Sequence, residues 1–224
     1  MVLRLKRHED ADSPRLADTV YVTLLEAILA GRLTPGTVVS ELALSRQLKV
    51  SRTPVHDALR KLGKDGLVLQ ATRCRATVVA VTREDVQDIF EMRRLLEAEA
   101  ARRAATRIDR QTLAQLRSAA DELAHGRRNR SWIRRWADFD EQCHAAIAQA
   151  SGSPRLASDI ARYRLLHRAL NQAATTVDVL QQAFEEHRRI LKALDRRDPD
   201  AAARTMEEHI REWQAYFANH MPAR

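Results

Sequence analysis

The chain has 224 residues, which is enough for one large or two modest domains with a proper core. It contains only 6 Gly and 6 Pro, a composition that favours long helices over turn-rich sheets. It lacks an apolar run near the roughly 20 residues needed to span a bilayer, and its first residues lack the apolar core of a secretory signal. We therefore expect no membrane association and a cytoplasmic location. Two cysteines, Cys74 and Cys143, exclude a disulfide framework and a thiolate zinc finger.

The positive charge is concentrated in one segment. The formal net charge is +8, and residues 46–75 hold eight basic side chains against two acidic ones. A basic segment can be an ordinary solvated helix face or a nucleic-acid-binding surface, so the pattern beneath the charge must decide between them.

Three short helices are predicted in the N-terminal part. Apolar residues at helical spacing indicate the first over residues 19–30, and Gly31 ends it. Ser40 is placed to cap a second helix, and residues 51–54 open a third, where Pro54 is tolerated in the first turn. The second helix is expected to bury Leu42, Leu44 and Leu48, and the third Val55, Leu59 and Leu62.

Two β-branched stretches follow, residues 67–69 and 77–81, and they can pair as a hairpin around residues 73–75. Three helices followed by a basic hairpin are the parts of a winged helix-turn-helix, in which Arg can grip guanine and helix N-terminal amides can hold phosphate. The candidate DNA-contacting residues are Ser51, Arg52, Thr53, His56, Arg60, Arg73 and Arg75.

The segment GRLTPGTVVSELALSRQLKVSRTPVHDALRKLGKDGLV, from Gly31 to Val68, resembles the GntR family of bacterial regulators. The resemblance implies base and backbone contacts by Arg52 and Thr53. Two features depart from the family pattern: His56 stands where an arginine is usual, and the hairpin lacks the usual glycine at its tip. We therefore expect an operator sequence that differs accordingly.

The remaining sequence predicts six helices, which favour an antiparallel bundle. The first begins after a capping-box pattern at residues 82–85, and the others span residues 110–123, 131–150, 154–172, 177–194 and 200–217. The expected fold is thus mainly α, with a winged helix-turn-helix at residues 13–81 and an antiparallel α-helical bundle at residues 82–220.

Arg93 and Glu97 fall within the apolar stripe of the first of these helices. They can form a buried ion pair, or Arg93 can line a pocket for an anionic ligand, because its planar fork matches a carboxylate.

Four metal-binding side chains lie on the apolar faces of three helices. Asp140 and His144 are four residues apart, one turn of a single helix, while His187 and His209 belong to the last two helices. A single histidine on such a face is usually a hydrogen-bonded core residue, but three imidazoles and a carboxylate together can bind a divalent transition metal. The other histidines, His8, His125, His167 and His220, show no such arrangement and are assigned no role.

DFDEQCHAAIAQASGSPRL from Asp138 and EEHRRILKALDRRDPDAAARTMEEHI from Glu185 resemble the FCD ligand-binding domain of the FadR subgroup. The resemblance implies that Asp140, His144, His187 and His209 are the metal ligands, with zinc first and nickel, manganese or iron as alternatives. FEMRRLLEAEAARRAA from Phe90 resembles the first helix of that domain, in which an arginine at the position of Arg93 often faces the effector.

Together these resemblances imply a bacterial, nucleoid-associated homodimer that binds an inverted-repeat DNA operator and represses a metabolic operon in response to a small organic acid. We expect no enzyme activity. Two alternatives stay open: a metal-dependent hydrolase, because an open metal site can activate water, and a regulator whose metal is purely structural.

Overall fold

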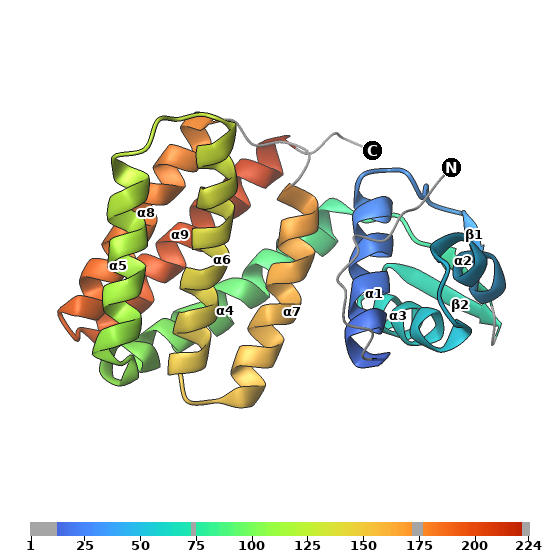
Figure 1. Cartoon of the computed structure of the whole chain (residues 1–224), viewed down its shortest axis with the longest axis horizontal. Helices are drawn as coiled ribbons and strands as arrows, with labels where there is room; N and C mark the ends of the chain where they lie inside the picture. The colour runs from blue at the N-terminus through green and yellow to red at the C-terminus, as the bar shows by residue number, and fades with distance from the viewer. Residues whose placement is uncertain (1–12, 73–74, 172–176, 221–224) are drawn as a thin grey trace. The chain divides into compact units, whose positions relative to one another are not determined.

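The structure is a computed structural model that describes residues 13–72, 75–171 and 177–220. Their contacts divide the chain into two compact units. One comprises Met1–Thr82 with residues 168–173, and the other comprises Arg83–His167 with residues 174–224. The prediction that the chain is mainly α is confirmed, because helices dominate the described residues (Figure 1). Arg73 and Cys74 lie outside the described residues, as does His8.

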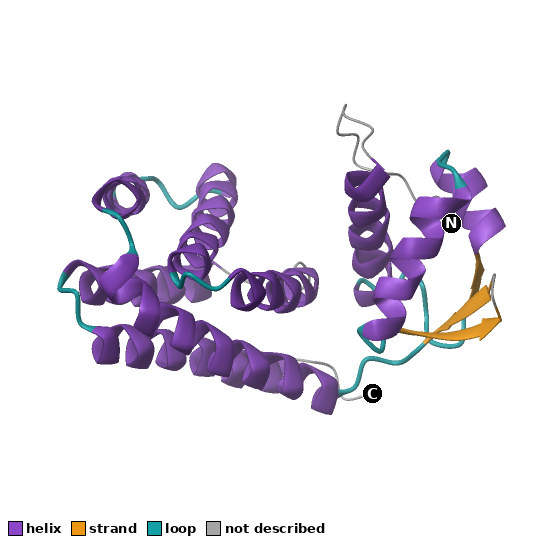
Figure 2. Ribbon diagram, turned by 90° about the horizontal axis from the view of Figure 1, so that it is seen from below, coloured by secondary structure: helices purple, strands orange, loops and turns teal. Residues whose placement is uncertain are grey.

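The N-terminal unit has three helices and three strands in its described part. The helices are α1 (Ser13–Leu29), α2 (Glu41–Leu48) and α3 (Arg52–Lys64), and α3 packs on both of the others. The strands are β1 (Val38–Ser40), β2 (Val68–Thr72) and β3 (Arg75–Val78), which form one small antiparallel sheet in the order β1-β3-β2 (Figure 2). The predicted hairpin is present as β2 and β3, whereas β1 was not expected.

Local sequence explains where these helices begin and end. The hydroxyl of Ser40 accepts a hydrogen bond from the Ala43 amide, as expected of an N-cap. Lys49 ends α2 in the left-handed conformation, with φ at 56°. Leu44 and Leu48 are buried as predicted, but the expectation for Leu42 is wrong, because it lies on the solvent side and is 47% exposed. The predicted inner face of α3, Val55, Leu59 and Leu62, is buried.

The C-terminal unit is helical throughout its described part. Its helices are α4 (Arg83–Arg107), α5 (Arg110–Ala124), α6 (Arg130–Ala150), α7 (Pro154–Asn171), α8 (Val177–Asp195) and α9 (Pro199–His220). These bounds match the six predicted helices closely. In Figure 1, α5, α6 and α8 lie side by side, in agreement with their mutual contacts.

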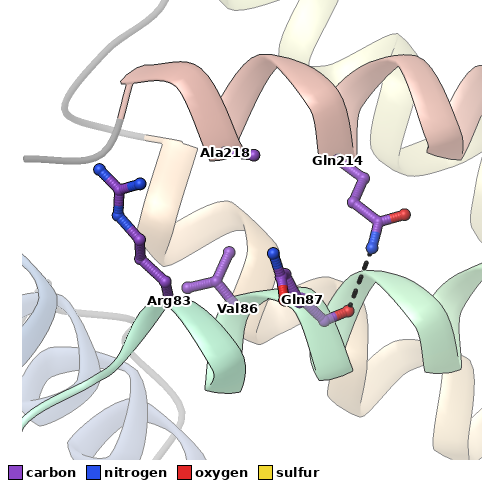
Figure 3. Close-up of a pocket in the computed structure, with 5 residues that line it drawn as sticks. All are labelled: Arg83, Val86, Gln87, Gln214 and Ala218. Atoms are coloured by element: carbon purple, nitrogen blue, oxygen red, sulfur yellow. Dashed lines mark hydrogen bonds between the residues drawn. The ribbon is translucent and has the colours of Figure 1, made fainter. Parts of the chain in front are cut away.

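The long helices α4 and α9 pack against each other in antiparallel register. Arg94 pairs with Glu207 at 2.7 Å, and Arg102, two turns further along α4, pairs with Asp200 near the start of α9. At the other end, Figure 3 shows a pocket between the first turn of α4 and the last turns of α9, where the Gln214 side chain reaches the Gln87 carbonyl. In the described part of the chain, none of the helices is long and apolar enough to cross a membrane.

Candidate functional site

The four predicted metal ligands converge in the core of the C-terminal unit. The ligand atoms of Asp140, His144, His187 and His209 all lie within 4.8 Å of one another. The α6 helix supplies two of them one turn apart, while α8 and α9 supply one each. The three imidazoles are at most 2% exposed, and Oδ1 of Asp140 lies 3.2 Å from Nε2 of His187. This arrangement fits the packing of α8 against both α6 and α9.

The Nδ1 atoms of the three histidines are held by the protein. Nδ1 of His187 lies 2.9 Å from the Ala183 carbonyl, and Nδ1 of His209 lies 2.7 Å from the Glu186 carboxylate. Nδ1 of His144 pairs with Glu97. Nε2 of His144 and of His187 is buried and has no hydrogen-bond partner among the described residues. Fixing one ring nitrogen through a carboxylate or carbonyl and leaving the other free is how proteins orient metal-binding imidazoles.

Burial favours the uncharged form of His144 and His209, which is the form that ligates metals. It lowers the pKa of His144 to about 3 and also lowers the pKa of His209. Burial alone would raise the pKa of the Asp140 carboxyl, but Arg164 and His187 hold that pKa well below its usual value. Three imidazoles and one carboxylate form a donor set that suits a divalent transition ion, so the residues present fit the predicted metal.

The Arg93–Glu97 pair is buried and ordered, with Nε of Arg93 donating to the Glu97 carboxylate at 2.8 Å. The other carboxylate oxygen of Glu97 faces His144, so Glu97 joins Arg93 to a metal ligand. Nη1 of Arg93 is buried and has no hydrogen-bond partner among the described residues. The buried ion pair is therefore present, and Arg93 keeps one donor without a hydrogen-bond partner in the described part of the chain. That Arg93 faces an anionic ligand stays a prediction.

Two residues of α7 belong to this site although the sequence did not single them out. Nη2 of Arg164 donates to Asp140 at 2.6 Å, and Arg164 is only 2% exposed. His167, to which the sequence assigned no role, is buried against Phe90, Trp213 and Phe217 and is not one of the four clustered ligands. The sequence of α7 contains several arginines, and nothing in their spacing distinguishes the buried one. His125, in contrast, is exposed.

The predicted DNA-contacting residues of the third helix lie at the N-terminal end of α3. Ser51 is the N-cap residue, and Ser51, Arg52, Thr53 and Arg60 are exposed. Nδ1 of His56, which is partly exposed, lies 2.7 Å from one carboxylate oxygen of Glu41, and Arg52 donates to the other at 3.3 Å. Glu41 itself is 4% exposed, so a buried carboxylate orients two side chains of the recognition helix. The spacing of residues along the chain did not predict these contacts of Glu41.

Of the wing residues, Arg75 is exposed at the start of β3, while Arg73 falls outside the described residues. An exposed arginine on this strand lies where a wing can approach DNA.

Comparison with known families assigns both units. Residues 16–79 match the model described as bacterial regulatory proteins, gntR family, and residues 88–212 match the FCD domain model. The second match alone covers more than half of the chain.

Relatives with similar sequences are regulators as well. The Escherichia coli HTH-type transcriptional repressor RspR is 26% identical over 197 residues, covering 86% of this chain and 85% of the relative. An HTH-type transcriptional regulator of Agrobacterium vitis is 30% identical over 142 residues, covering 62% of this chain and 82% of the relative.

Solved structures show the same fold. Escherichia coli McbR/YncC matches with a TM-score of 0.70 at 23% identity, covering 91% of this chain and 97% of that one. Listeria monocytogenes Lar matches with a TM-score of 0.59 at 18% identity, covering 94% and 99%. The chain therefore belongs to the GntR family of bacterial DNA-binding transcriptional regulators and carries an FCD domain behind its helix-turn-helix.

Proposed function

We propose that this regulator is a repressor that senses a small carboxylate through a metal held by Asp140, His144, His187 and His209. The observation that carries the proposal is the free donor of buried Arg93 beside a cluster of buried ligand atoms. A divalent ion in the cluster would act as a Lewis acid that binds a carboxylate oxygen. Nη1 of Arg93 would then donate to the same carboxylate, because guanidinium and carboxylate geometries match.

Repression is supported by the relatives, since RspR is described as a transcriptional repressor. We further propose that the protein acts as a homodimer on an inverted-repeat operator, because a two-fold protein requires a two-fold site. The protein would exchange between a state that binds the operator tightly and a state that binds it weakly. A ligand with different affinities for these two states would shift the balance between them and so change operator affinity.

We also propose that the protein has no enzyme activity. The carboxylates nearest the histidines have other partners: Glu97 holds Arg93 and His144, while Glu186 holds His209 and Gln182. A hydrolase would need one of them to accept a proton from a metal-bound water.

The test compares operator affinity of zinc-loaded protein with and without each acid of a panel, by gel shift on DNA selected from a random pool. Acids that bind, as shown by calorimetry, should change operator affinity in the wild type and not in His187→Ala. If acids bind without any effect on operator affinity, the proposed coupling is wrong. If metal is bound but no acid binds, the metal is structural.

A further inference from the structure

Two side chains of α7 have buried polar atoms that the described residues leave unpartnered. Arg164 is 2% and His167 is 4% exposed. Arg164 uses Nη2 for Asp140 and Glu141, whereas its Nε and Nη1 and both ring nitrogens of His167 have no hydrogen-bond partner among the described residues. Buried polar groups are nearly always hydrogen-bonded, so these four nitrogens indicate a ligand or ordered water at α7.

These two residues share their surroundings with Arg93. The rings of His167 and Phe90 meet edge-on with centroids 5.3 Å apart, and Cζ of Arg93 lies 5.6 Å from the centroid of the same Phe90 ring. Burial lowers the pKa of His167, and the charges of Arg93 and Arg164 lower it further. Arg164 in turn contacts Asp140, one of the four clustered ligands. The free donors of α4 and α7 therefore belong to one site.

A single carboxylate is too small to satisfy all of these donors. Its two oxygens offer about four acceptor positions, and the proposed function uses two of them for the metal and for Nη1 of Arg93. The N–H groups on Nε and Nη1 of Arg164, together with a ring N–H of His167, outnumber the positions that remain. The free N–H groups of Arg164 and the ring N–H of His167 then require another acceptor, because a buried guanidinium is costly when its donors lack partners.

The positive charge of Arg164 is only partly compensated by the residues around it. Its Nη2 contacts Asp140 at 2.6 Å and Glu141 at 3.1 Å. The Glu141 side chain is 39% exposed, so water screens its charge. An anionic group at the unpartnered nitrogens of Arg164 would face this charge, whereas water molecules there would supply hydrogen bonds alone.

We propose, on the basis of the function proposed above, that Arg164 and His167 bind a second carboxylate of the same ligand. The effector is then a small dicarboxylate. One of its carboxylates faces the metal and Arg93, and the other accepts hydrogen bonds from Arg164 and His167.

The experiment compares acids of equal carbon number on zinc-loaded, full-length protein by calorimetry: butyrate with succinate, and valerate with glutarate. His167→Phe is the informative variant, because it keeps an aromatic ring against Phe90, Trp213 and Phe217 while removing both nitrogens. His125→Phe, at an exposed position, is the matched control. Zinc content and circular dichroism establish that each variant is folded and loaded.

We expect at least one dicarboxylate to bind wild-type protein about ten-fold more tightly than its monocarboxylate partner, as one charged hydrogen bond allows. His167→Phe should remove most of that advantage and leave the monocarboxylate within about two-fold of wild type. If the two acids of each pair bind with equal affinity, or if His167→Phe weakens both acids of a pair equally, the proposal of a dicarboxylate effector is wrong. The proposed function would still stand. Failure of all four acids to bind zinc-loaded protein would count against both.

Discussion

Glu97 contacts both His144, a proposed metal ligand, and Arg93, which is proposed to bind the carboxylate of the effector. It accepts a hydrogen bond from Arg93 at 2.8 Å and also pairs with Nδ1 of His144. Burial alone would raise its pKa, but Arg93 and His144 hold that pKa well below its usual value, so the carboxylate is charged. Glu97 therefore orients the metal ligand and the arginine together.

Replacing Glu97 by Gln should weaken zinc binding by about ten- to hundred-fold, because partners that orient a ligating histidine contribute that much to metal affinity. Competition with a chromophoric chelator measures the effect. Glu99→Gln is the control, since Glu99 lies on the same helix but pairs with Arg103 in a partly exposed position. Equal zinc affinity in the two variants would show that Glu97 does not orient His144.

His167 gives a second prediction, based on pH. Burial, with Arg93 and Arg164, lowers the pKa of His167 in the folded protein, whereas in the unfolded chain this imidazole titrates near its ordinary value of about 6.5. Below that pH the His167 imidazole is protonated in the unfolded state but stays neutral in the folded state. Wild-type protein should therefore lose stability relative to His167→Phe by about 1.4 kcal/mol per pH unit.

Urea unfolding of chelator-treated wild type and His167→Phe between pH 7 and pH 5 tests this difference. Comparing the two proteins cancels the titration of the other groups, which both share. A difference in unfolding free energy that stays constant over this range would mean that His167 takes up its proton at the same pH in the folded and unfolded states, so that folding does not lower its pKa.

At the scale of single residues, the sequence predicted those site residues that lie on clear apolar stripes. Asp140, His144, His187 and His209 each interrupt such a stripe, so their convergence could be expected from helix geometry. Arg164 and His167 could not be found this way, because the burial of α7 residues depends on packing against other helices. Glu41 was missed for the same reason: its partners lie on α3 and are set by how two short helices pack.

At the scale of elements, the helices were predictable because the spacing of their apolar residues and the residues that cap their ends lie close together in the sequence. The strand β1 was not, since its three residues become a strand only by pairing with β3, far along the chain, in the register Val39 to Ala76. The hairpin of β2 and β3 was predictable, because its two strands are adjacent in sequence and rich in β-branched residues.

The recognition helix α3 carries a prediction about DNA. His56 is partly exposed, and its Nδ1 lies 2.7 Å from the Glu41 carboxylate, at a position where the GntR pattern usually has an arginine. His56→Arg would keep the Glu41 contact and add a permanent positive charge near the DNA backbone. Operator affinity should rise at low salt, and the slope of log K against log salt should steepen by about one.

Fluorescence anisotropy at several salt concentrations measures that slope, on DNA selected from a random pool with wild-type protein. His125→Arg is the control, because it adds the same charge at an exposed position in the C-terminal unit. An unchanged slope in His56→Arg would place residue 56 away from the phosphates.

At the scale of the whole molecule, metal removal tests the site on which the proposed function depends. The folded protein brings four ligand atoms within 4.8 Å, whereas the unfolded chain disperses them, so metal binds the folded state preferentially. Binding of this kind stabilises by about 2.7 kcal/mol when free metal is a hundred times its dissociation constant. Chelation should therefore lower the unfolding temperature, and stoichiometric zinc should restore it.

Replacing a metal-binding side chain distinguishes stabilisation by bound metal from general effects of salt or chelator. Asp140→Asn would weaken the metal site but also disturb Arg164, which donates to Asp140 at 2.6 Å. His187→Gln is the sharper variant, because the Nδ1 partner of His187 is only a backbone carbonyl. Its unfolding temperature should be insensitive to chelator and to zinc, while wild type responds to both. Equal responses of the two proteins would mean that zinc acts elsewhere on the chain, and the sensing site built on these four ligands would then be wrong.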